Sequence, residues 1–187
     1  MKKFNISSFT TPYRAQLILS AYKKWFKKDG KALDVGCGTG IVANILKREL
    51  GIKITGCDIK NYLVYNIPFV KINGDKLPFP KHSFDVVLFN DVLHHIDKSK
   101  QEQVLNEALR VGKNVFIFEI EPSISGKIFD IILNKFHYGD LAVPLAFRNT
   151  TEWKQMFKTI SANSEYIKLK RPFWYPFTHL VFKVTKK

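Results

Sequence analysis

The sequence has few cysteines, few acidic residues and no long apolar run. Its 187 residues include two cysteines, Cys37 and Cys57, which excludes a disulfide-rich secreted scaffold, and we expect both thiols to be reduced and mostly buried. No apolar run approaches the roughly 20 residues of a membrane-spanning helix. The segment Met1–Asn5 is not followed by the apolar region of a signal peptide. A cytoplasmic protein without a membrane span is therefore expected.

The shortage of acidic residues leaves a formal net charge of +14, with 30 lysines and arginines against 16 aspartates and glutamates. Such a surface attracts polyanions, nucleic acid among them, through long-range fields. However, arginine is the residue best suited to bidentate phosphate recognition, and 25 of the 30 basic residues are lysine. The charge therefore permits a nucleic-acid partner, but the composition does not favour one over a small-molecule acceptor.

The length favours one domain over residues 1–187, because it suffices for one core and is too short for two sizeable ones. Residues 1–30 are predicted to form an N-terminal arm and a helix. Thr11 and Pro12 mark the start of this helix, as an N-cap followed by proline at the first helical position.

A glycine-rich stretch, Lys31–Gly40, carries the most specific pattern in the chain. Its short, largely apolar run at 32–35 predicts a strand covered on both faces. The glycines at 36, 38 and 40 then allow a sharp turn and a close approach to a ligand. An amphipathic helix is predicted over Ile41–Leu50, and Gly51 is placed for a left-handed C-terminal cap. Strand, glycine loop and helix N-terminus form the first half of a nucleotide-binding βαβ unit.

The spacing of the loop and one acidic residue indicate which ligand binds there. The pattern is G-x-G-x-G, whereas the dinucleotide fingerprint is G-x-G-x-x-G. Asp34, near the end of the strand, would repel a pyrophosphate at the helix N-terminus. A ligand that carries an ammonium and a sulfonium but no phosphate, as S-adenosylmethionine does, suits this position. The segment Leu33–Gly40 resembles the first motif of the class I S-adenosylmethionine-dependent methyltransferases, and an NAD enzyme is disfavoured.

A second carboxylate, Asp58, follows the next predicted strand, Lys53–Cys57, 18 residues after the last loop glycine. At this place a carboxylate can accept both ribose hydroxyls of an adenosine. In the resembling family the next residue, here Ile59, lies against adenine. The segment Gly74–Pro80 resembles the one in which an aspartate, here Asp75, accepts the adenine amino group.

The resemblance thus implies S-adenosylmethionine as cofactor, with S-adenosylhomocysteine as product. It also implies a set of cofactor-binding residues near the strand ends: Asp34, Gly36, Cys37, Gly38, Gly40, Asp58, Ile59, Asp75, Lys76 and Asn90. One departure is expected. Only ten residues separate Asp58 from the third predicted strand, Phe69–Asn73, so the crossover helix usual in the family has little room.

The fourth predicted strand, Phe84–Phe89, runs into Asn90–Ile96, which closely resembles the post-strand motif of the type 11 group of small-molecule methyltransferases. The Asn/Asp-Pro-Pro-aromatic motif, with which resembling enzymes grip the amino group of adenine or the amide of glutamine, is absent. Methylation of adenine N6 or of glutamine is therefore disfavoured.

Two histidines in this motif, His94 and His95, are the candidate catalytic residues because they follow a strand at the carboxyl edge of the sheet. We expect His95 to be the inward-facing one and a candidate general base. The alternative is structural, with one imidazole buried and hydrogen-bonded and the other exposed. No metal is expected, because no HExxH motif or Cys/His cluster accompanies the pair.

The remaining elements complete an α/β fold. Ser99–Glu102 reads as a capping box that opens a helix, followed by a strand at Val115–Ile120 and a helix at Ser125–Phe136. A short amphipathic helix around Trp153 and strands at Tyr166–Leu169 and Leu180–Val184 end the chain. The predicted architecture is a doubly wound, mostly parallel, seven-stranded Rossmann-like sheet with helices on both faces. The resemblance implies the strand order 3-2-1-4-5-7-6, with the last strand antiparallel.

The acceptor is the least specified part of this prediction. Residues 121–177 are expected to carry the substrate-side insertions, and they are rich in aromatic residues that would lie over the transferred methyl group. A small apolar or aromatic acceptor is therefore expected. Two alternatives stay open: an RNA or protein methyltransferase that uses the basic surface, and a non-catalytic subunit that binds S-adenosylmethionine.

Overall fold

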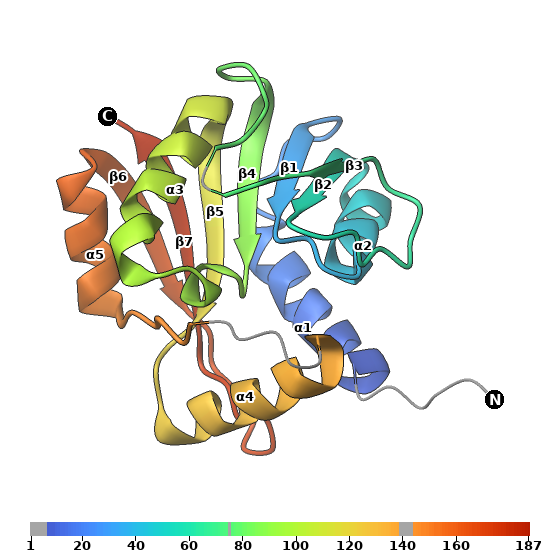
Figure 1. Ribbon diagram of the computed structural model, residues 1–187, viewed down its shortest axis with the longest axis vertical. Helices are drawn as coiled ribbons and strands as arrows, with labels where there is room; N and C mark the ends of the chain where they lie inside the picture. Colours follow the sequence, from blue (N-terminus) through green and yellow to red (C-terminus); the bar gives the residue numbers. More distant parts are fainter. Residues whose placement is uncertain (1–6, 75, 139–143) are drawn as a thin grey trace.

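A seven-stranded sheet with helices on both faces organises the computed structural model, which describes residues 7–74, 76–138 and 144–187 (Figure 1). The strands are β1 (Lys31–Val35), β2 (Lys53–Asp58), β3 (Phe69–Lys71), β4 (Phe84–Asn90), β5 (Gly112–Ile120), β6 (Ala162–Lys168) and β7 (His179–Lys186). The helices are α1 (Ser7–Tyr22), α2 (Ile41–Leu50), α3 (Lys98–Val111), α4 (Ile124–Tyr138) and α5 (Thr150–Thr159), with a 3₁₀ turn, η1 (Leu93–His95), after β4.

The strand order β3-β2-β1-β4-β5-β7-β6 confirms the predicted doubly wound topology. β1 pairs in parallel with β2 and β4, while β2–β3 and β4–β5 are also parallel. β7 runs antiparallel to both of its neighbours, β5 and β6, as predicted for the last strand. The parallel strands therefore end at one edge, the lower one in Figure 1, which we call the carboxyl edge.

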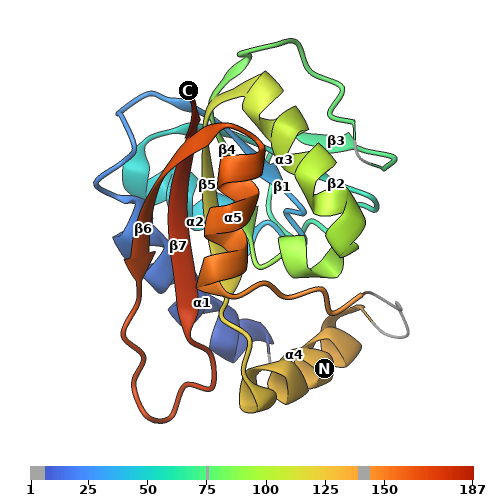
Figure 2. The ribbon, with the colours of Figure 1, turned by 90° about the vertical axis from the view of Figure 1, so that its left-hand side faces the viewer.

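The core has two layers, one on each face of the sheet. α1 and α2 cover one face, and α3 and α5 cover the other (Figure 2). In β4, Val87 and Phe89 pack under α3, whereas Val86 and Leu88 pack on the opposite side. Strands buried on both faces read as continuous apolar runs, which explains why the central strands were recognisable in the sequence.

Three segments lie beyond the carboxyl edge instead of on a face of the sheet. In both views α4, the N-terminal part of α1 and the loop between β6 and β7 occupy this end (Figures 1 and 2). They enclose the strand ends at which the predicted site residues stand. None of the helices in the described ranges combines the length and the apolar character that crossing a bilayer requires.

The first helix begins earlier than predicted. α1 starts at Ser7, so Thr11 is not its N-cap and Pro12 lies inside it. Proline lacks the N–H that would bond to the fourth residue before it, but its fixed φ suits a helix. Because Pro12 stands close to the N-terminal end, the helix loses a single backbone hydrogen bond there and continues upstream.

The predicted capping box at Ser99–Glu102 is wrong. α3 begins at Lys98, and its N-cap is Asp97 instead of Ser99. No side chain caps the helix. The carbonyl of Asp97 already accepts the amides of Lys100 (2.8 Å) and Gln101 (3.2 Å), so Ser99 lies within the first turn.

Other local predictions are confirmed. Gly51 caps α2 with a φ of 64°, and its N–H bonds to the carbonyl of Lys47. The connection from β2 to β3 contains no helix, as its short length indicated. One boundary differs: β3 ends at Lys71, two residues before the predicted end at Asn73. Cys37 and Cys57 are both free and buried.

Candidate functional site

The glycine loop after β1 is a tight turn whose amides are used by the protein itself. Gly36, Gly38 and Gly40 have φ of 69°, 50° and 75°, the left-handed region that only glycine enters without strain. The amides of Gly36 and Cys37 donate to the carbonyl of Cys57 at 2.8 and 3.2 Å, and Gly40 donates to the carbonyl of Cys37 at 2.9 Å. These amides are not free to cradle a phosphate.

Close neighbours also demand glycine in this region. A Cβ at Gly36 would overlap the side chain of Val92, and one at Gly40 would lie 2.7 Å from Leu63. Gly56 in β2 is equally constrained, because a Cβ there would lie 2.7 Å from Cys37 Sγ. The loop is therefore packed against both β2 and the segment after β4.

Asp58 ends β2 beside this loop. Its Oδ2 accepts the amide of Gly38 at 2.9 Å, and its Oδ1 accepts the amide of Ile59 at 2.7 Å. Burial raises the pKa of this carboxyl, although these backbone donors oppose the shift. Ile59 next to it is 51% exposed, an apolar side chain at the rim of the carboxyl edge. A half-buried carboxylate next to an exposed apolar side chain suits an adenosine, whose ribose hydroxyls can donate to the carboxylate while the flat adenine ring lies on the apolar side chain.

Asp34 is a buried carboxylate with a shifted pKa. Its Oδ1 accepts the side-chain amide of Asn90 at 2.9 Å, and Asn90 Oδ1 accepts the Tyr22 hydroxyl of α1 at 3.1 Å. Burial is the main cause that raises the pKa of Asp34 to about 7; the bond from Asn90 opposes it, and the charge of Asp58 adds to it. A cationic ligand at the strand end would favour the ionised form.

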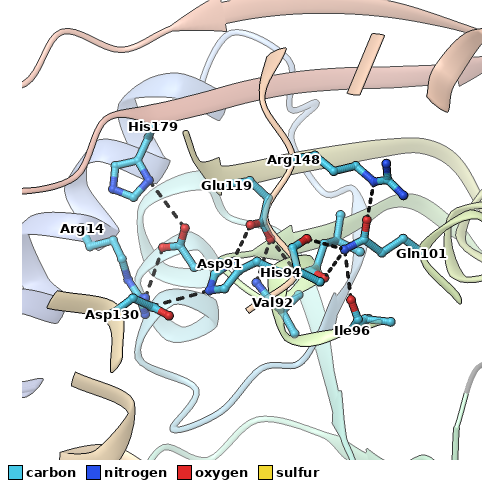
Figure 3. A network of polar contacts seen from close by, with 12 residues as sticks. Arg14, Asp91, Val92, His94, Ile96, Gln101, Glu119, Asp130, Arg148 and His179 are labelled. Carbon is cyan, nitrogen blue, oxygen red and sulfur yellow. Dashed lines mark hydrogen bonds and ion pairs between the residues drawn. The ribbon is translucent and has the colours of Figure 1, made fainter. Parts of the chain in front are cut away.

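Glu119, near the end of β5, fixes the turn that follows β4. Its Oε1 accepts the amides of Val92 (2.9 Å) and Leu93 (2.7 Å), and its Oε2 lies 2.6 Å from Nδ1 of His94 (Figure 3). One buried carboxylate thus satisfies two orphan amides at the start of η1 and one imidazole nitrogen.

The histidine pair consists of two imidazoles in opposite protonation states. Burial alone would lower the pKa of His94, but Glu119 and Asp130, whose Oδ1 lies 3.6 Å from His94 Nε2, outweigh it and raise the pKa to about 10. Burial and the charge of His94 lower the pKa of His95 to about 4. At neutral pH His94 is therefore charged and His95 is neutral.

This arrangement corrects the predicted orientation. His94, not His95, faces inward: it is 1% exposed and its ring stacks on Phe147 at 4.6 Å. His95 is partly exposed, and its Nδ1 has no hydrogen-bond partner among the described residues. The physical reason is Glu119, which needs a donor in the core and takes it from the first of the two histidines.

Donor atoms of His94, His95 and Asp130 lie within 4.8 Å of one another, close enough to share a cation, which the sequence did not predict. However, the high pKa of His94 means that its Nε2 already carries a proton, and Asp130 Oδ1 lies 3.6 Å from that nitrogen. We assign the cluster to this ion pair for this reason.

Asp91, the residue after β4, ties α1 and β7 to the carboxyl edge. Its Oδ2 lies 3.2 Å from Arg14 of α1, and its Oδ1 lies 3.5 Å from Nδ1 of His179 (Figure 3). Burial opposes ionisation of Asp91, but the charges of His179, Arg14 and His94 outweigh it and lower its pKa. Its φ of 54° is strained for a residue other than glycine, which these ion pairs offset.

Gln101 of α3 joins the segment before α5 to the turn after β4. Its amide nitrogen donates to the carbonyls of Leu93, Ile96 and Ala146 at 2.9 to 3.0 Å, and its carbonyl accepts Arg148. The turn that carries His94 and His95 is thus held by Glu119 of β5 and by Gln101 of α3.

Comparison with known proteins finds related sequences and folds. The sequence profile of the type 11 family, described as a methyltransferase domain, matches residues 33–117, from β1 into β5. This match is consistent with the class I S-adenosylmethionine-dependent methyltransferases. A solved S-adenosylmethionine-dependent methyltransferase from Aquifex aeolicus shares the fold, with a TM-score of 0.68 over 91% of this chain and 89% of that one at 17% identity.

Two curated proteins align with parts of this chain. Arginine-hydroxylase NDUFAF5 of Rattus norvegicus is 41% identical over 73 residues, 35% of this chain and 21% of the relative. The ubiquinone biosynthesis O-methyltransferase of Vibrio cholerae is 28% identical over 134 residues, 65% of this chain and 54% of the relative. The chain therefore spans between 21% and 54% of the length of these two relatives.

The residues present fit S-adenosylmethionine, the cofactor of the family. The loop between β1 and α2 has no lysine or arginine for a phosphate, and its amides at 36, 37, 38 and 40 have protein acceptors. Two carboxylates, Asp34 and Asp58, face the loop instead, which suits a cation and a ribose diol. Ile59 supplies an exposed apolar side chain for adenine.

The structure brings most of the predicted cofactor-binding residues together at the ends of β1, β2 and β4. Cys37 packs against Gly56, and burial raises the pKa of its thiol, so it is inert packing. Lys76 is exposed, in the segment before β4. Asp75 lies outside the described residues.

The sequence prediction did not include the polar and charged residues that organise the site: Arg14, Asp91, Gln101, Glu119, Asp130 and His179. Some carried a signal in the sequence. Glu119 interrupts the apolar run of β5 and Asp130 that of α4, and an acid within an apolar segment needs buried donors.

We predict that Asp34→Asn stabilises the free protein and weakens cofactor binding. Because the folded pKa is about 7 against the usual 3.8, the carboxyl favours folding at low pH, and this contribution is lost as pH rises from about 4 to about 7. Asparagine keeps an acceptor for Asn90 without the charge. The expected gain in unfolding free energy is on the order of 4 kcal/mol at pH 8 and near zero at pH 4.

Urea unfolding at the two pH values measures the gain, and calorimetric titration measures the affinity. The control is Asp85→Asn, a carboxylate at the opposite edge whose pKa is lowered by the Lys31 amide and Lys113. A variant that is destabilised at pH 8, or that binds S-adenosylmethionine as tightly as the parent protein, would contradict the role given to Asp34.

Proposed function

We propose that this protein transfers the methyl group of S-adenosylmethionine to a small apolar or aromatic acceptor. The observation that carries the proposal is the site formed by Asp34, Asp58 and the closed glycine loop, where carboxylates stand in place of free phosphate-binding amides. The bound cofactor supplies an electrophilic methyl group on a sulfonium. Displacement at such a methyl group depends on alignment and exclusion of water more than on covalent catalysis.

Each residue then has a defined task in holding the cofactor. Asp58 binds the ribose hydroxyls, Ile59 lies against adenine, and the charge of Asp34 offsets that of the amino acid part of the cofactor. Tyr22 and Asn90 keep Asp34 oriented through their hydrogen bonds. α1 covers the site, since Arg14 anchors it to Asp91. By the resemblance of the segment Gly74–Pro80 to its counterpart in the family, Asp75 accepts the adenine amino group.

An apolar cluster under the carboxyl edge supports an apolar acceptor. Ile120, Phe147, Tyr175 and Phe177 are buried together, and Tyr13 of α1 packs against them. They come from residues 121–177 and their border, the part that we propose to determine the substrate. One relative is named for O-methylation in ubiquinone biosynthesis, which supports an acceptor of this chemistry.

The name of the other relative denotes arginine hydroxylation, but its similarity is confined to 73 residues, or 35% of this chain. A match of that extent supports a cofactor-binding segment common to both proteins. It does not support a common reaction, because the rest of the chain lies outside the match. Methyl transfer therefore stays the better-supported proposal.

His95 is the proposed general base for an acceptor that must lose a proton. It is neutral at pH 7, and its Nδ1 has no hydrogen-bond partner among the described residues. It also adjoins His94, whose ring stacks on Phe147 of the apolar cluster. His94 cannot take this part, because it already holds a proton between Glu119 and Asp130. It instead positions His95, whose ring centroid lies 4.1 Å from its own.

Asp58→Ala should abolish most of the affinity for S-adenosylmethionine. Two charge-assisted hydrogen bonds to the ribose, each worth about 1.5 to 3 kcal/mol, would be lost, so Kd should rise about tenfold or far more. Asp58→Asn is the sharper variant, because it keeps an acceptor for a backbone amide while removing the charge. Calorimetric titration measures both variants.

Asp85→Ala removes a carboxylate at the opposite edge of the sheet and should leave the cofactor affinity unchanged. If folded Asp58 variants bind like the parent protein, the ribose is held elsewhere. Binding of S-adenosylmethionine without turnover of any acceptor would favour the non-catalytic alternative. Turnover of RNA with steep salt dependence would favour the polyanion alternative.

His95→Ala should lower turnover by about 10² to 10⁴ and change cofactor affinity by no more than a few fold. Burial and the charge of His94 lower the pKa of His95 to about 4, although the charges of Asp130 and Asp91 oppose this shift. The rate of the parent enzyme should therefore rise through about pH 4. It should then be level near pH 7 as far as this group is concerned. The pH–rate profile with the best acceptor measures both effects.

The matched control is His82→Asn, at an exposed histidine in the turn before β4 whose φ of 55° suits asparagine. It should keep the rate and the profile. If His95→Ala retains full turnover and an unchanged profile, the pair is structural and alignment alone suffices.

A further inference from the structure

α4 exposes its apolar side and buries its acidic residue, the reverse of an ordinary surface helix. Four isoleucines at i, i+4, i+7 and i+8 face solvent: Ile124 is 83% exposed, Ile128 52%, Ile131 50% and Ile132 44%. Asp130, in contrast, is 7% exposed and turned toward His94. The burial of Asp130 against the histidine pair fixes the rotation of the helix, so the isoleucine face cannot turn inward.

The loop between β6 and β7 adds two aromatic side chains at the same end of the molecule. Phe173 is 98% exposed and Trp174 59% exposed. The ring of Trp174 rests on Tyr13 of α1, with centroids 4.8 Å apart, so the loop is held in place. Both views place this loop and α4 together beyond the carboxyl edge (Figures 1 and 2). We call the four isoleucines with Phe173 and Trp174 the apolar end.

The exposed charges that the structure describes on α4 and on the β6–β7 loop are all positive. Lys127 and Lys135 on α4 and Lys170 and Arg171 in the loop are exposed. Within α4 and residues 169–178 the sequence has one acidic residue, Asp130, and it is buried. Isolated exposed apolar residues are ordinary, but six exposed apolar side chains on two segments at one end of the molecule, accompanied there by exposed cations, indicate a binding surface.

The exposed cations decide between two occupants of this surface. A second copy of the chain would bring the same cations against themselves across a twofold axis, and the whole chain carries +14. An anionic bilayer offers both complements at once: headgroups for the lysines and arginine, and an acyl boundary for the isoleucines and aromatic rings. Tryptophan and lysine are also the side chains that settle at such a boundary.

We propose that the apolar end docks onto the surface of a membrane that contains anionic phospholipid. The chain lies on the bilayer without spanning it, with α4 and the tip of the β6–β7 loop in the headgroup layer. The carboxyl edge, with the cofactor site, then faces the membrane. This docking is independent of the proposed methyl transfer and is tested without it.

The test is sedimentation of the full chain with vesicles of phosphatidylcholine alone and of phosphatidylcholine with phosphatidylglycerol at about 7:3. The chain should bind the anionic vesicles about tenfold or more tightly than the neutral ones, and less tightly at about 0.5 M salt. Tryptophan emission should shift to the blue on binding. Trp174→Phe should remove the shift, because Trp153 is 1% exposed and Trp25 is half-buried against Phe116 in the α1 face of the sheet.

Matched variants separate the apolar and the charge contributions. Phe173→Ser with Ile128→Asn should weaken vesicle binding about tenfold or more, whereas Val64→Ser, at a residue 68% exposed in the β2–β3 connection, should not. Lys127→Gln and Arg171→Gln should each weaken it about fivefold. Lys31→Gln and Lys53→Gln remove exposed cations at the opposite edge of the sheet and should have little effect.

All of these positions are exposed, and thermal melting followed by circular dichroism verifies that each variant is folded. Failure of the parent chain to bind anionic vesicles would overturn the proposal. Equal binding by the Phe173 and Val64 variants would also overturn it. So would a dimer in sizing chromatography that Phe173→Ser dissolves, because the second copy would then be the occupant.

Discussion

A single buried carboxylate, that of Glu119, organises the functional end of this fold. A carboxylate on a central strand must find donors inside the protein, since water cannot reach it. Glu119 finds three of them in one turn, the amides of Val92 and Leu93 and the imidazole of His94. The turn after β4 is thereby closed against β5, and everything that packs on this turn inherits its position.

Glu119 favours the protonated form of His94, and the positive charge of His94 in turn acts on the groups around it. His94 stays protonated between Glu119 and Asp130, and its charge helps to keep His95 neutral. Asp91, one turn earlier, holds Arg14 and His179 and so ties the first helix and the last strand to the same edge. A histidine pair that is symmetric in the sequence therefore becomes an anchor and a candidate base because their surroundings differ.

The same end of the molecule contains groups that oppose stability. Asp34 is a buried carboxyl whose pKa burial raises to about 7, Asp91 has a strained backbone, and α4 leaves isoleucines in solvent. Functional sites commonly contain such local violations, while the rest of the sheet obeys the ordinary rules of pattern and packing. Here they gather on one edge, next to the glycine loop, which supports placing both the cofactor site and the acceptor side there.

The sheet itself was predictable because its signals are local. Buried strands appear as apolar runs, Gly51 marks a helix end, and the glycine loop has a spacing that only certain ligands fit. The family resemblance gave the strand order, which the structure confirms. Asp34 and Asp58 could be placed because Asp34 is the last residue but one of β1 and Asp58 is the last residue of β2.

The network at the carboxyl edge was not predictable, because its partners are far apart in the chain. Arg14 and Asp91 are separated by 77 residues, and His94 and Glu119 by 25. Nothing near His94 in the sequence indicates that it, and not His95, would turn inward. The capping box failed for a different reason: Asp97 is the N-cap, and its carbonyl accepts the amides of Lys100 and Gln101, so Ser99 lies inside the first turn.

The central claim is that the loop between β1 and α2, with its two carboxylates, selects a sulfonium nucleoside over a dinucleotide. Calorimetric titration of the unmodified chain with S-adenosylmethionine, S-adenosylhomocysteine and NAD under identical conditions tests it most directly. The account predicts saturable binding of the first two ligands and no measurable binding of NAD, since Asp34 repels its pyrophosphate and the loop amides are occupied. Tight binding of NAD without binding of the other two would contradict it.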